Sequence, residues 1–440
     1  MLPKTESACF VIADISGYTS FLAGVELDHA HDIIADVMDT VVRRLRPPFR
    51  LAKFEGDAAF FYAVNDKIDG SLLQDAIESA YFAFRKRLRN IKQATSCECS
   101  ACREMQKLDL KFVSHHGEFI KHRMAGRGEL AGRDVIVVHR LLKNAVNECI
   151  GGHAYALYSD PCIQAMGIDP FAQGLVEHRE AVDSIGDVKC WVRDLEAAWA
   201  KESDSQRNEV TRDKAALVIE FDIAAPRPLV WEYFTQPGQR PKWRGADEVR
   251  ETSKSGRRGV GTINHCMHGA HVIIEEVIDW RPFDYLTLTT LMPMPDAPKV
   301  LMTYAFTEGP GGGTHIEIRV AKPKPKDQAF LEHVGAEFHK NITNEIATLR
   351  KMLEGQHGAA AGVEEPALPV SAERFLTQPV HAREGGPLNY WTTLSARSKT
   401  PCGIVTPIAF AVLRFIASSN FANCSTGKSA GLAPFKILLT

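Results

Sequence analysis

Two aspartates near the start of the chain, Asp14 and Asp57, have the residue type and the setting of a divalent-metal site. Asp14 ends the apolar run in FVIADISGYTSFL, and Asp57 lies between two apolar runs in LAKFEGDAAFFYAV. Hard cations such as Mg²⁺ take oxygen ligands and share their remaining sites with water and substrate phosphates. Two neighbouring carboxylates otherwise repel each other, so a cation between them would give the arrangement a purpose. A plainer interpretation also fits, in which Asp14 caps a turn and Asp57 is a hairpin residue.

The segments around these aspartates are predicted to alternate between strand and helix. Apolar residues recur at helical spacing over 26–45 and again over 71–92, and apolar runs flank the turn FEGD, where Gly56 supplies backbone freedom. A strand precedes the first helix and another follows the second, so the order is strand–helix–strand–strand–helix–strand, as in a ferredoxin-like layer. The first and third strands of such a layer are neighbours, which would bring both aspartates to one rim of the sheet.

Four blocks in this region, DISGYTSFL, KFEGDAAFF, HHGEF and GRDVIVVHRLLKNA, occur in the order of a known family. Together they resemble the catalytic domain of class III nucleotidyl cyclases, over about residues 9–199. The resemblance implies a two-metal site for Mg²⁺ or Mn²⁺, with Asp14 and Asp57 as ligands and the carbonyl of Ile15 as a further ligand.

The same resemblance assigns the nucleotide contacts and the assembly. Lys53 falls on the position that selects the purine base, and Glu129 on the position of its partner. Arg140 matches the arginine that stabilises charge on the phosphate, an electrostatic contribution of a few kcal/mol. Ile136 stands where the family has an asparagine that contacts the ribose, and an aliphatic side chain cannot donate that hydrogen bond. The resemblance further implies a purine nucleoside triphosphate as substrate and a homodimer, because each of two chains supplies half of a site.

A short cluster, SCECSACREM, places Cys97, Cys99 and Cys102 within six residues. Thiolates at this spacing can hold a structural Zn²⁺, which needs four ligands. Cys149 or His122 could supply the fourth. A reduced thiol-rich loop or a redox switch is the alternative. With the four blocks, the insert also resembles a bacterial family of cyclase-homology proteins that supplies no settled activity.

Residues 214–355 resemble the START-like, Bet v 1-type superfamily, which includes polyketide-cyclase-like proteins. The resemblance rests on IAAPRPLVWEYFTQPGQRPKW, GVGT, EEVIDWRPFDYLTL, GGGTHIEI and a long final helix from about 327 to 353. In this fold a curved antiparallel sheet wraps around a long helix and leaves an apolar cavity, so a hydrophobic small molecule is the expected partner. The candidate lining residues, each equally compatible with plain core, are Trp231, Phe234, Trp243, Trp280, Met292 and Phe338.

The 440 residues therefore divide into an α+β chain of two domains. We expect a ferredoxin-like cyclase domain at 1–199, a charged linker at 200–213, a helix-grip domain at 214–355 and a weakly structured tail at 356–440. The formal net charge of −2 argues against nucleic-acid binding. Ten scattered cysteines, the absence of a signal-peptide pattern and the absence of a long uninterrupted apolar run favour a cytoplasmic protein without a membrane span.

Two functions of different classes follow from these features. The first is a Mg²⁺-dependent nucleotidyl cyclase whose output responds to a hydrophobic ligand in the helix-grip domain. The second is a cyclase-like scaffold without turnover, because of Ile136, that serves as a lipid or small-molecule sensor.

Overall fold

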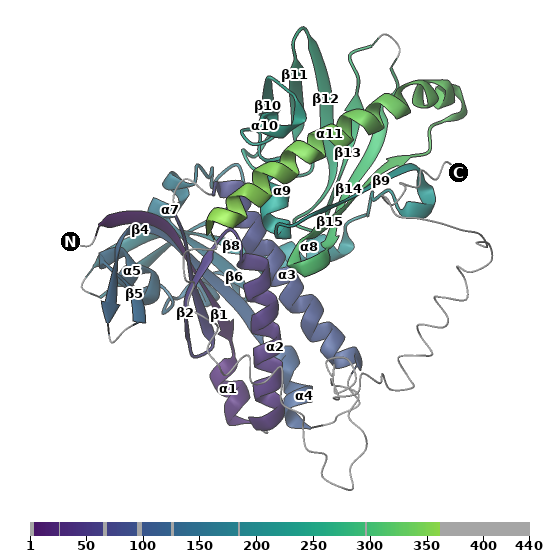
Figure 1. The fold of residues 1–440 in the computed structure, drawn as a ribbon. Helices are drawn as coiled ribbons and strands as arrows, with labels where there is room; N and C mark the ends of the chain where they lie inside the picture. Colours follow the sequence, from purple (N-terminus) through teal and green to yellow (C-terminus); the bar gives the residue numbers. More distant parts are fainter. Residues whose placement is uncertain are drawn as a thin grey trace, which may run out of the picture. The chain divides into compact units, whose positions relative to one another are not determined.

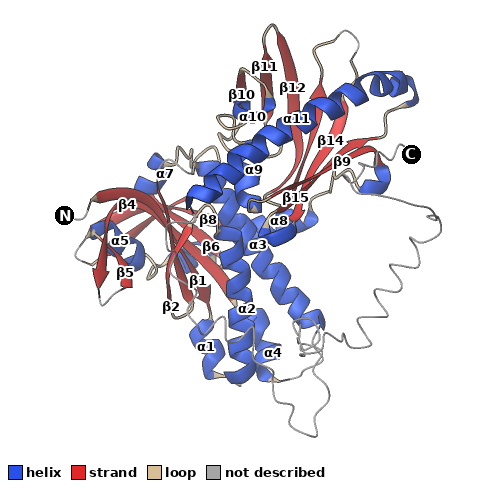
Figure 2. Cartoon of the chain, viewed as in Figure 1, coloured by secondary structure: helices blue, strands red, loops and turns tan. Residues whose placement is uncertain are grey.

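The computed structural model describes residues 4–25, 27–64, 68–94, 99–124, 127–183, 185–294 and 297–360. Its strands form two sheets, one of eight strands and one of seven, with helices packed on them (Figures 1 and 2). The α+β fold class is confirmed, as are both sheet domains in the predicted order.

The eight-stranded sheet has the order β2-β3-β1-β4-β6-β8-β7, with β5 paired to β4. Its strands are β1 (Thr5–Ser16), β2 (Arg50–Glu55), β3 (Ala58–Val64), β4 (Asp109–Met124), β5 (Arg127–Ala131), β6 (Tyr155–Ser159), β7 (Val176–Val182) and β8 (Gly186–Asp194). Its helices are α1 (Tyr18–Ala23), α2 (Leu27–Leu45), α3 (Gly70–Ala94), α4 (Ser100–Glu104), α5 (Arg133–Arg140), α6 (Val146–Ile150), α7 (Asp160–Ala165) and α8 (Leu195–Asp204). Strand β1 lies between β3 and β4, as the ferredoxin-like order requires.

Strand β1 is buried on both faces, which explains its continuous apolar run. Cys9, Val11 and Ala13 share a core cluster with α2 and α3, whose predicted stripes are buried. Phe10 and Ile12 face the other way, into a second cluster with α5. Figure 1 shows α2 and α3 side by side against the sheet. A strand held on both faces fixes the position of the residue at its end, which is Asp14.

The predicted hairpin turn at FEGD is present. Strands β2 and β3 pair antiparallel with Glu55 opposite Ala58, and Gly56 has a φ of 68°, a left-handed conformation that costs glycine little. The turn presents Asp57 at the rim where β1 ends.

The predicted linker at 200–213 is not a loose connector. Its first residues belong to α8, and the following ones pack on the second sheet. The backbone N–H of Asn208 donates to Asp279 (2.8 Å), and that of Val210 donates to the Thr303 hydroxyl (2.8 Å). Two charged side chains of this segment also pair with the second sheet, Glu209 with Arg319 (2.7 Å) and Arg212 with Glu317 (3.2 Å).

The seven-stranded sheet has the order β10-β11-β12-β13-β14-β15-β9 and is antiparallel throughout. Its strands are β9 (Ala215–Ile223), β10 (Glu248–Thr252), β11 (Ile263–His268), β12 (His271–Arg281), β13 (Tyr285–Leu291), β14 (Val300–Glu308) and β15 (Thr314–Ala321). Its helices are α9 (Arg227–Thr235), α10 (Pro241–Arg244) and α11 (Gln328–Ala360). Figure 2 shows α11 lying across the strands, the arrangement of a helix-grip domain.

The apolar residues along one face of α11 differ in burial between its two halves. Its second half, Ile342, Ile346, Leu349 and Leu353, is fully buried in the core. Phe338 in the first half is only partly buried and borders a cavity. The helix continues to residue 360, beyond the predicted domain end, and the rest of the predicted tail, 361–440, lies outside the described residues.

The helix-grip domain is tied to α3 by the loop between β10 and β11. Arg257 on this loop bonds Asp75 (2.9 Å) and Glu78 (2.7 Å), and the indole N–H of Trp280 donates to Asp75 (3.1 Å). Both carboxylates are buried. Removing one partner of a buried ion pair of this kind leaves the other charge uncompensated in the interior.

Asp75 should make stability depend on pH. Burial raises its pKa to about 6, although Arg257 opposes the shift. The folded protein then holds a proton that the unfolded chain releases near pH 4, so the free energy of unfolding falls as the pH rises from about 4 to 6, by roughly 3 kcal/mol. We expect Asp75→Asn to remove this decline in urea unfolding measured at several pH values. An unchanged slope would contradict the assignment.

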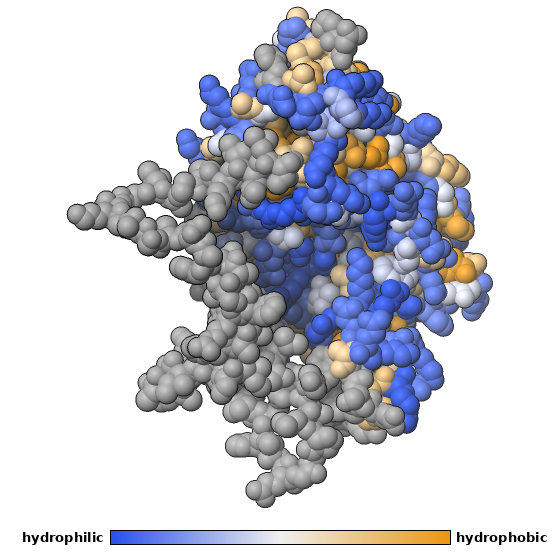
Figure 3. All heavy atoms as spheres, turned by 90° about the vertical axis from the view of Figure 1, so that its right-hand side faces the viewer, coloured by the Kyte–Doolittle hydropathy of each residue, from blue (hydrophilic) through white to orange (hydrophobic). Residues whose placement is uncertain are grey.

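No helix among the described residues is long and apolar enough to cross a membrane. The face drawn in Figure 3 is mainly hydrophilic, with smaller apolar groups between the polar ones.

Candidate functional site

The structure brings Asp14 and Asp57 to the same rim of the first sheet. Asp14 pairs in register with Ala58, the residue after Asp57, and the backbone N–H of Ile15 approaches the Asp57 carbonyl at 3.4 Å. Burial and the negative charge of Asp14 both raise the pKa of Asp57. The two carboxylates therefore repel each other electrostatically, and a cation bound near both would reduce that repulsion.

Lys111 is a third charged residue at this rim, and the sequence interpretation did not include it. It lies opposite Asp14 on β4, and its Nζ is 3.1 Å from Asp14 Oδ2 and donates to the Leu142 carbonyl at 3.3 Å. Its ammonium offsets part of the acidic charge. A lysine within the buried strand LDLKFV was the available signal, because an unpaired buried lysine is costly.

Lys53 and Glu129, predicted to act together on the base, lie in one cluster. Lys53 Nζ is 2.8 Å from Glu55 and 3.5 Å from Glu129. The hydrogen bond to Glu55 is the largest of the causes that raise the pKa of Lys53. His139 approaches Glu55 at 3.0 Å from α5. Glu55 and His139 were missed because only the hairpin and α5 together bring them near Lys53.

Helix α5 presents Ile136 and Arg140 to solvent. Ile136 is 54% exposed, and Arg140, four residues on and therefore on the same face, is also exposed. Both side chains therefore lie on the exposed face of α5. In the described part of the chain, no hydrogen bond or ion pair joins Arg140 to Asp14 or Asp57.

Gly117 allows α5 to sit close to β4. A Cβ there would come within 2.3 Å of the Asp134 carboxylate, which accepts the backbone N–H of Glu118 at 2.7 Å. The glycine of HHGEF thus has a packing role beside the candidate site.

The cysteine cluster is only partly described. Cys97 lies outside the described residues. The Cys99 sulfur accepts the backbone N–H of Cys102 at 3.5 Å, which caps α4. Cys149, a suggested fourth ligand, instead has its Sγ 3.5 Å from His178 Nδ1. Zinc binding stays a prediction.

Glu220, His315 and Glu317, on neighbouring strands β9 and β15, have ligand atoms within 4.8 Å of one another. Arg212 forms ion pairs with both glutamates, so this group is a surface ion-pair network.

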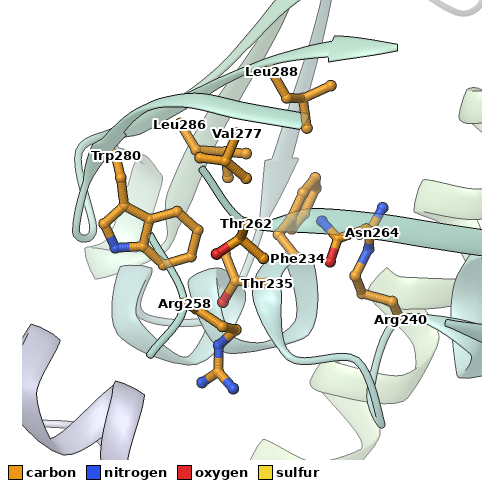
Figure 4. Close-up of a pocket in the computed structure, with 10 residues that line it drawn as sticks. All are labelled: Phe234, Thr235, Arg240, Arg258, Thr262, Asn264, Val277, Trp280, Leu286 and Leu288. Atoms are coloured by element: carbon orange, nitrogen blue, oxygen red, sulfur yellow. The ribbon is translucent and has the colours of Figure 1, made fainter. Parts of the chain in front are cut away.

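Two cavities lie along the helix-grip sheet. The one we call the Arg240 cavity has a volume of about 270 Å³, part of it open to solvent, and its apolar lining is Phe234, Val277, Trp280, Leu286 and Leu288 (Figure 4). The other, the Phe338 cavity, has about 370 Å³ on the same measure, and its lining includes Leu217, Met292, Met302, Val334 and Phe338. The enclosed space is only about 10 Å³ in the first cavity and about 20 Å³ in the second, roughly room for one water molecule each.

The predicted lining residues divide among these cavities and the core. Phe234 and Trp280 line the Arg240 cavity, while Met292 and Phe338 line the Phe338 cavity. Trp231 and Trp243 line neither. Both are almost fully buried, Trp231 packed edge-on against neighbouring rings and Trp243 donating its indole N–H to the Tyr233 carbonyl. Large aromatic residues on the inner face fill the core before they reach a cavity.

Two family models match the chain, one within the first sheet domain and one over the second. Residues 34–149 match a family model described as a protein of unknown function (DUF2652). Residues 214–354 match a family model described as polyketide cyclase / dehydrase and lipid transport. An uncharacterized protein of Mycobacterium tuberculosis is 39% identical over 113 residues, which are 26% of this chain and 52% of that protein. The chain thus spans about half the length of this curated relative.

Several solved structures are similar to parts of the chain. The adenylyl cyclase CyaB from P. aeruginosa is 16% identical, with 48% of this chain and 100% of that chain covered at a TM-score of 0.33. The guanylyl cyclase Cya2 is 14% identical, with 44% and 93% covered at 0.32. The protein Ms6760 from Mycobacterium smegmatis is 16% identical, with 34% and 96% covered at 0.27. The C-terminal part of the chain thus matches a polyketide-cyclase-type family model over residues 214–354, and its strands have the helix-grip arrangement.

Proposed function

We propose that the first domain is a nucleotidyl cyclase that converts a purine nucleoside triphosphate into a cyclic nucleotide, and that the helix-grip domain binds a hydrophobic molecule that regulates it. The observation that carries the proposal is the meeting of Asp14 and Asp57 at the rim of β1 and β3. Incubation of the purified chain with ATP or GTP and Mg²⁺ or Mn²⁺, followed by mass spectrometry of the nucleotides, tests it.

The donor set at this rim suits Mg²⁺ or Mn²⁺. It offers two carboxylates, from Asp14 and Asp57, together with the carbonyl of Ile15 as the further ligand. Burial raises the pKa of Asp57, and the negative charge of Asp14 adds to the shift. A bound ion supplies neutralisation of the phosphates and a lower pKa for the attacking hydroxyl. Lys111 keeps the pair of carboxylates together by offsetting part of their charge.

The remaining residues of this proposal bind and orient the nucleotide. Lys53, held by Glu55 and near Glu129, offers a donor to the base. Arg140, exposed on α5, stabilises charge on the phosphate of a site that it shares with a second copy of the chain. A homodimer is therefore part of the proposal.

Regulation is supported by residues that touch both the Arg240 cavity and α3. Arg258 lines the cavity and forms a bidentate ion pair with Asp69, just before α3 (both 2.8 Å). Trp280 lines the cavity and donates to Asp75 on α3. A molecule that displaces either side chain would break its contact with Asp69 or Asp75. Helix α3 packs on the sheet that carries Asp14, so the loss of such a contact could reach the candidate site.

Ile136→Asn is expected to raise the rate of cyclic nucleotide formation by roughly 10- to 100-fold, because the amide restores a donor for the ribose. Steady-state rates on both variants check this. Ile136→Leu is the matched control and should leave the rate unchanged. If Ile136→Asn and the parent formed product at the same rate, Ile136 would not be at the position that contacts the ribose.

A second candidate function is supported by the same residue. Ile136 is exposed and aliphatic at the position of a ribose contact, which suits a scaffold that senses a ligand without turnover. Nucleotide binding without any cyclic product, from the parent and from Ile136→Asn, would favour this candidate over the first.

A further inference from the structure

A thiol, an imidazole and a carboxylate lie in a row where α6 meets β7. The Cys149 sulfur on α6 is 3.5 Å from Nδ1 of His178, and Nε2 of His178 is 2.9 Å from a Glu180 oxygen. Cys149 is exposed, whereas the side chains of His178 and Glu180 are only 6% and 15% exposed. A nucleophile beside a base that a third group orients is the arrangement of activated cysteines. The proposed cyclase chemistry uses none of these three side chains.

The hydrogen bond to Glu180 determines which ring nitrogen of His178 can act as a base. An ionised carboxylate only accepts, so Nε2 carries the proton that it donates to Glu180. In the neutral ring Nδ1 is then an acceptor, and it lies next to the Cys149 sulfur. The Cys149 thiol therefore donates toward Nδ1. If its proton moves to the ring, the adjacent Glu180 carboxylate stabilises the imidazolium.

Glu180 also holds the base and the thiol in place. His178 and Glu180 are two residues apart on β7, so both side chains lie on the same face of the strand. The Glu180 oxygen that bonds His178 also accepts the backbone N–H of Ala145 at 3.0 Å, directly before α6. One carboxylate thus positions both the imidazole and the start of the helix that carries Cys149.

A second thiol near the same histidine lacks this arrangement. Cys190 on β8 lies opposite His178, but it is buried, and its sulfur donates to the Val188 carbonyl at 3.7 Å. Burial raises the pKa of Cys190 to about 12. The thiolate is the reactive form of cysteine and a reagent must reach it, so of these two thiols Cys149 is the nucleophile.

Metal binding explains the group less well. Structural Zn²⁺ takes four ligands. In the described part of the chain, the group of three side chains whose ligand atoms lie within 4.8 Å of one another is Glu220, His315 and Glu317, which does not include Cys149.

We propose that Cys149 is a modification site that small hydroperoxides oxidise to a sulfenic acid. The sulfur attacks the terminal oxygen of the hydroperoxide, so that an S–O bond forms and the O–O bond breaks. Sulfur gives up two electrons and the peroxide gains them, while the leaving alkoxide or hydroxide takes the proton that His178 received from the thiol. This reaction needs a reachable sulfur and a proton donor beside it, which an exposed thiol next to a buried imidazole supplies.

The pH profile of alkylation tests the activation. The full chain is treated with iodoacetamide, and peptide mass spectrometry follows each cysteine separately. An isolated thiol passes from about half to about 1% thiolate between about pH 8.5 and 6.5, so its rate falls about 50-fold. For Cys149 we expect a fall of less than about tenfold, because His178 accepts the proton, and in His178→Asn we expect the fall of an isolated thiol. The profile of an isolated thiol in the parent would overturn the inference.

Glu180→Gln keeps an acceptor for Nε2 but removes the charge that stabilises the imidazolium. Its fall in rate should therefore lie between those of the parent and His178→Asn. Glu177→Gln is the matched control, because it makes the same change on the same strand in a glutamate that pairs with Arg179 and Lys189 on the surface. It should keep the parent's profile. A profile of Glu180→Gln equal to that of the parent would overturn the role of Glu180.

Hydrogen peroxide, followed by dimedone to trap sulfenic acid, tests the oxidation. We expect the Cys149 peptide to gain the adduct at least about tenfold faster in the parent than in His178→Asn, and Cys190 to gain none. Circular dichroism with thermal melting checks that the variants fold; should His178→Asn not fold, the parent's pH profile and Glu180→Gln still decide. A pH profile as expected with no dimedone adduct on Cys149 would overturn the hydroperoxide as the oxidant. Equal adduct rates in the parent and in His178→Asn would overturn the role of His178.

Discussion

Asp57→Asn is expected to lower the rate of cyclic nucleotide formation by at least about 1000-fold, or about 4 kcal/mol in activation free energy. Asparagine keeps the shape of the side chain and the hairpin turn, but it removes the charge that would hold a divalent ion between β1 and β3. Product formation by the purified variants, measured by mass spectrometry at saturating Mn²⁺, is the readout.

The control for this change is Asp187→Asn, which removes an exposed carboxylate at the start of β8. It should leave the rate unchanged. If the parent forms cyclic nucleotide and Asp57→Asn forms it as fast, the metal assignment would be wrong. Loss of product together with unchanged thermal stability would place the effect at the site rather than in the fold.

Arg257→Leu is expected to lower the free energy of unfolding by about 3–5 kcal/mol. The change leaves Asp75 and Glu78 buried beside α3 without the guanidinium that neutralises them. Burial would raise the pKa of Glu78, but Arg257 and Arg193 outweigh it and lower the pKa to about 2. Urea unfolding followed by tryptophan fluorescence measures the loss, since Trp280 lies at this contact.

The matched control is Arg250→Leu, which removes an exposed arginine that pairs with Glu248 on the surface. It should change stability by less than about 1 kcal/mol. Adding Asp75→Asn and Glu78→Gln to Arg257→Leu should recover part of the loss, because the uncompensated charges then disappear. A loss below about 1 kcal/mol for Arg257→Leu would show that water reaches these carboxylates.

Local patterns in the sequence determined the elements and the place of the acidic pair. The helices at 26–45 and 71–92 form within two residues of their predicted ends, because an apolar stripe at helical spacing needs only a sheet to pack on. The FEGD turn forms because a glycine there adopts a left-handed φ. Asp14 and Asp57 follow from these elements, since β1 and β3 are neighbours in the predicted order.

Only the tertiary structure decided which side chains form ion pairs with these carboxylates and which contacts join the two sheets. Lys111 reaches Asp14 only because β4 pairs with β1, and Arg257 reaches α3 from 179 residues away along the chain. The cavity residues were only partly predictable for the same reason: Arg240 has no apolar pattern to reveal it, and Trp231 and Trp243 went to the core. Periodicity records which face of an element is buried, whereas the partner of a buried charge depends on packing between elements distant in sequence.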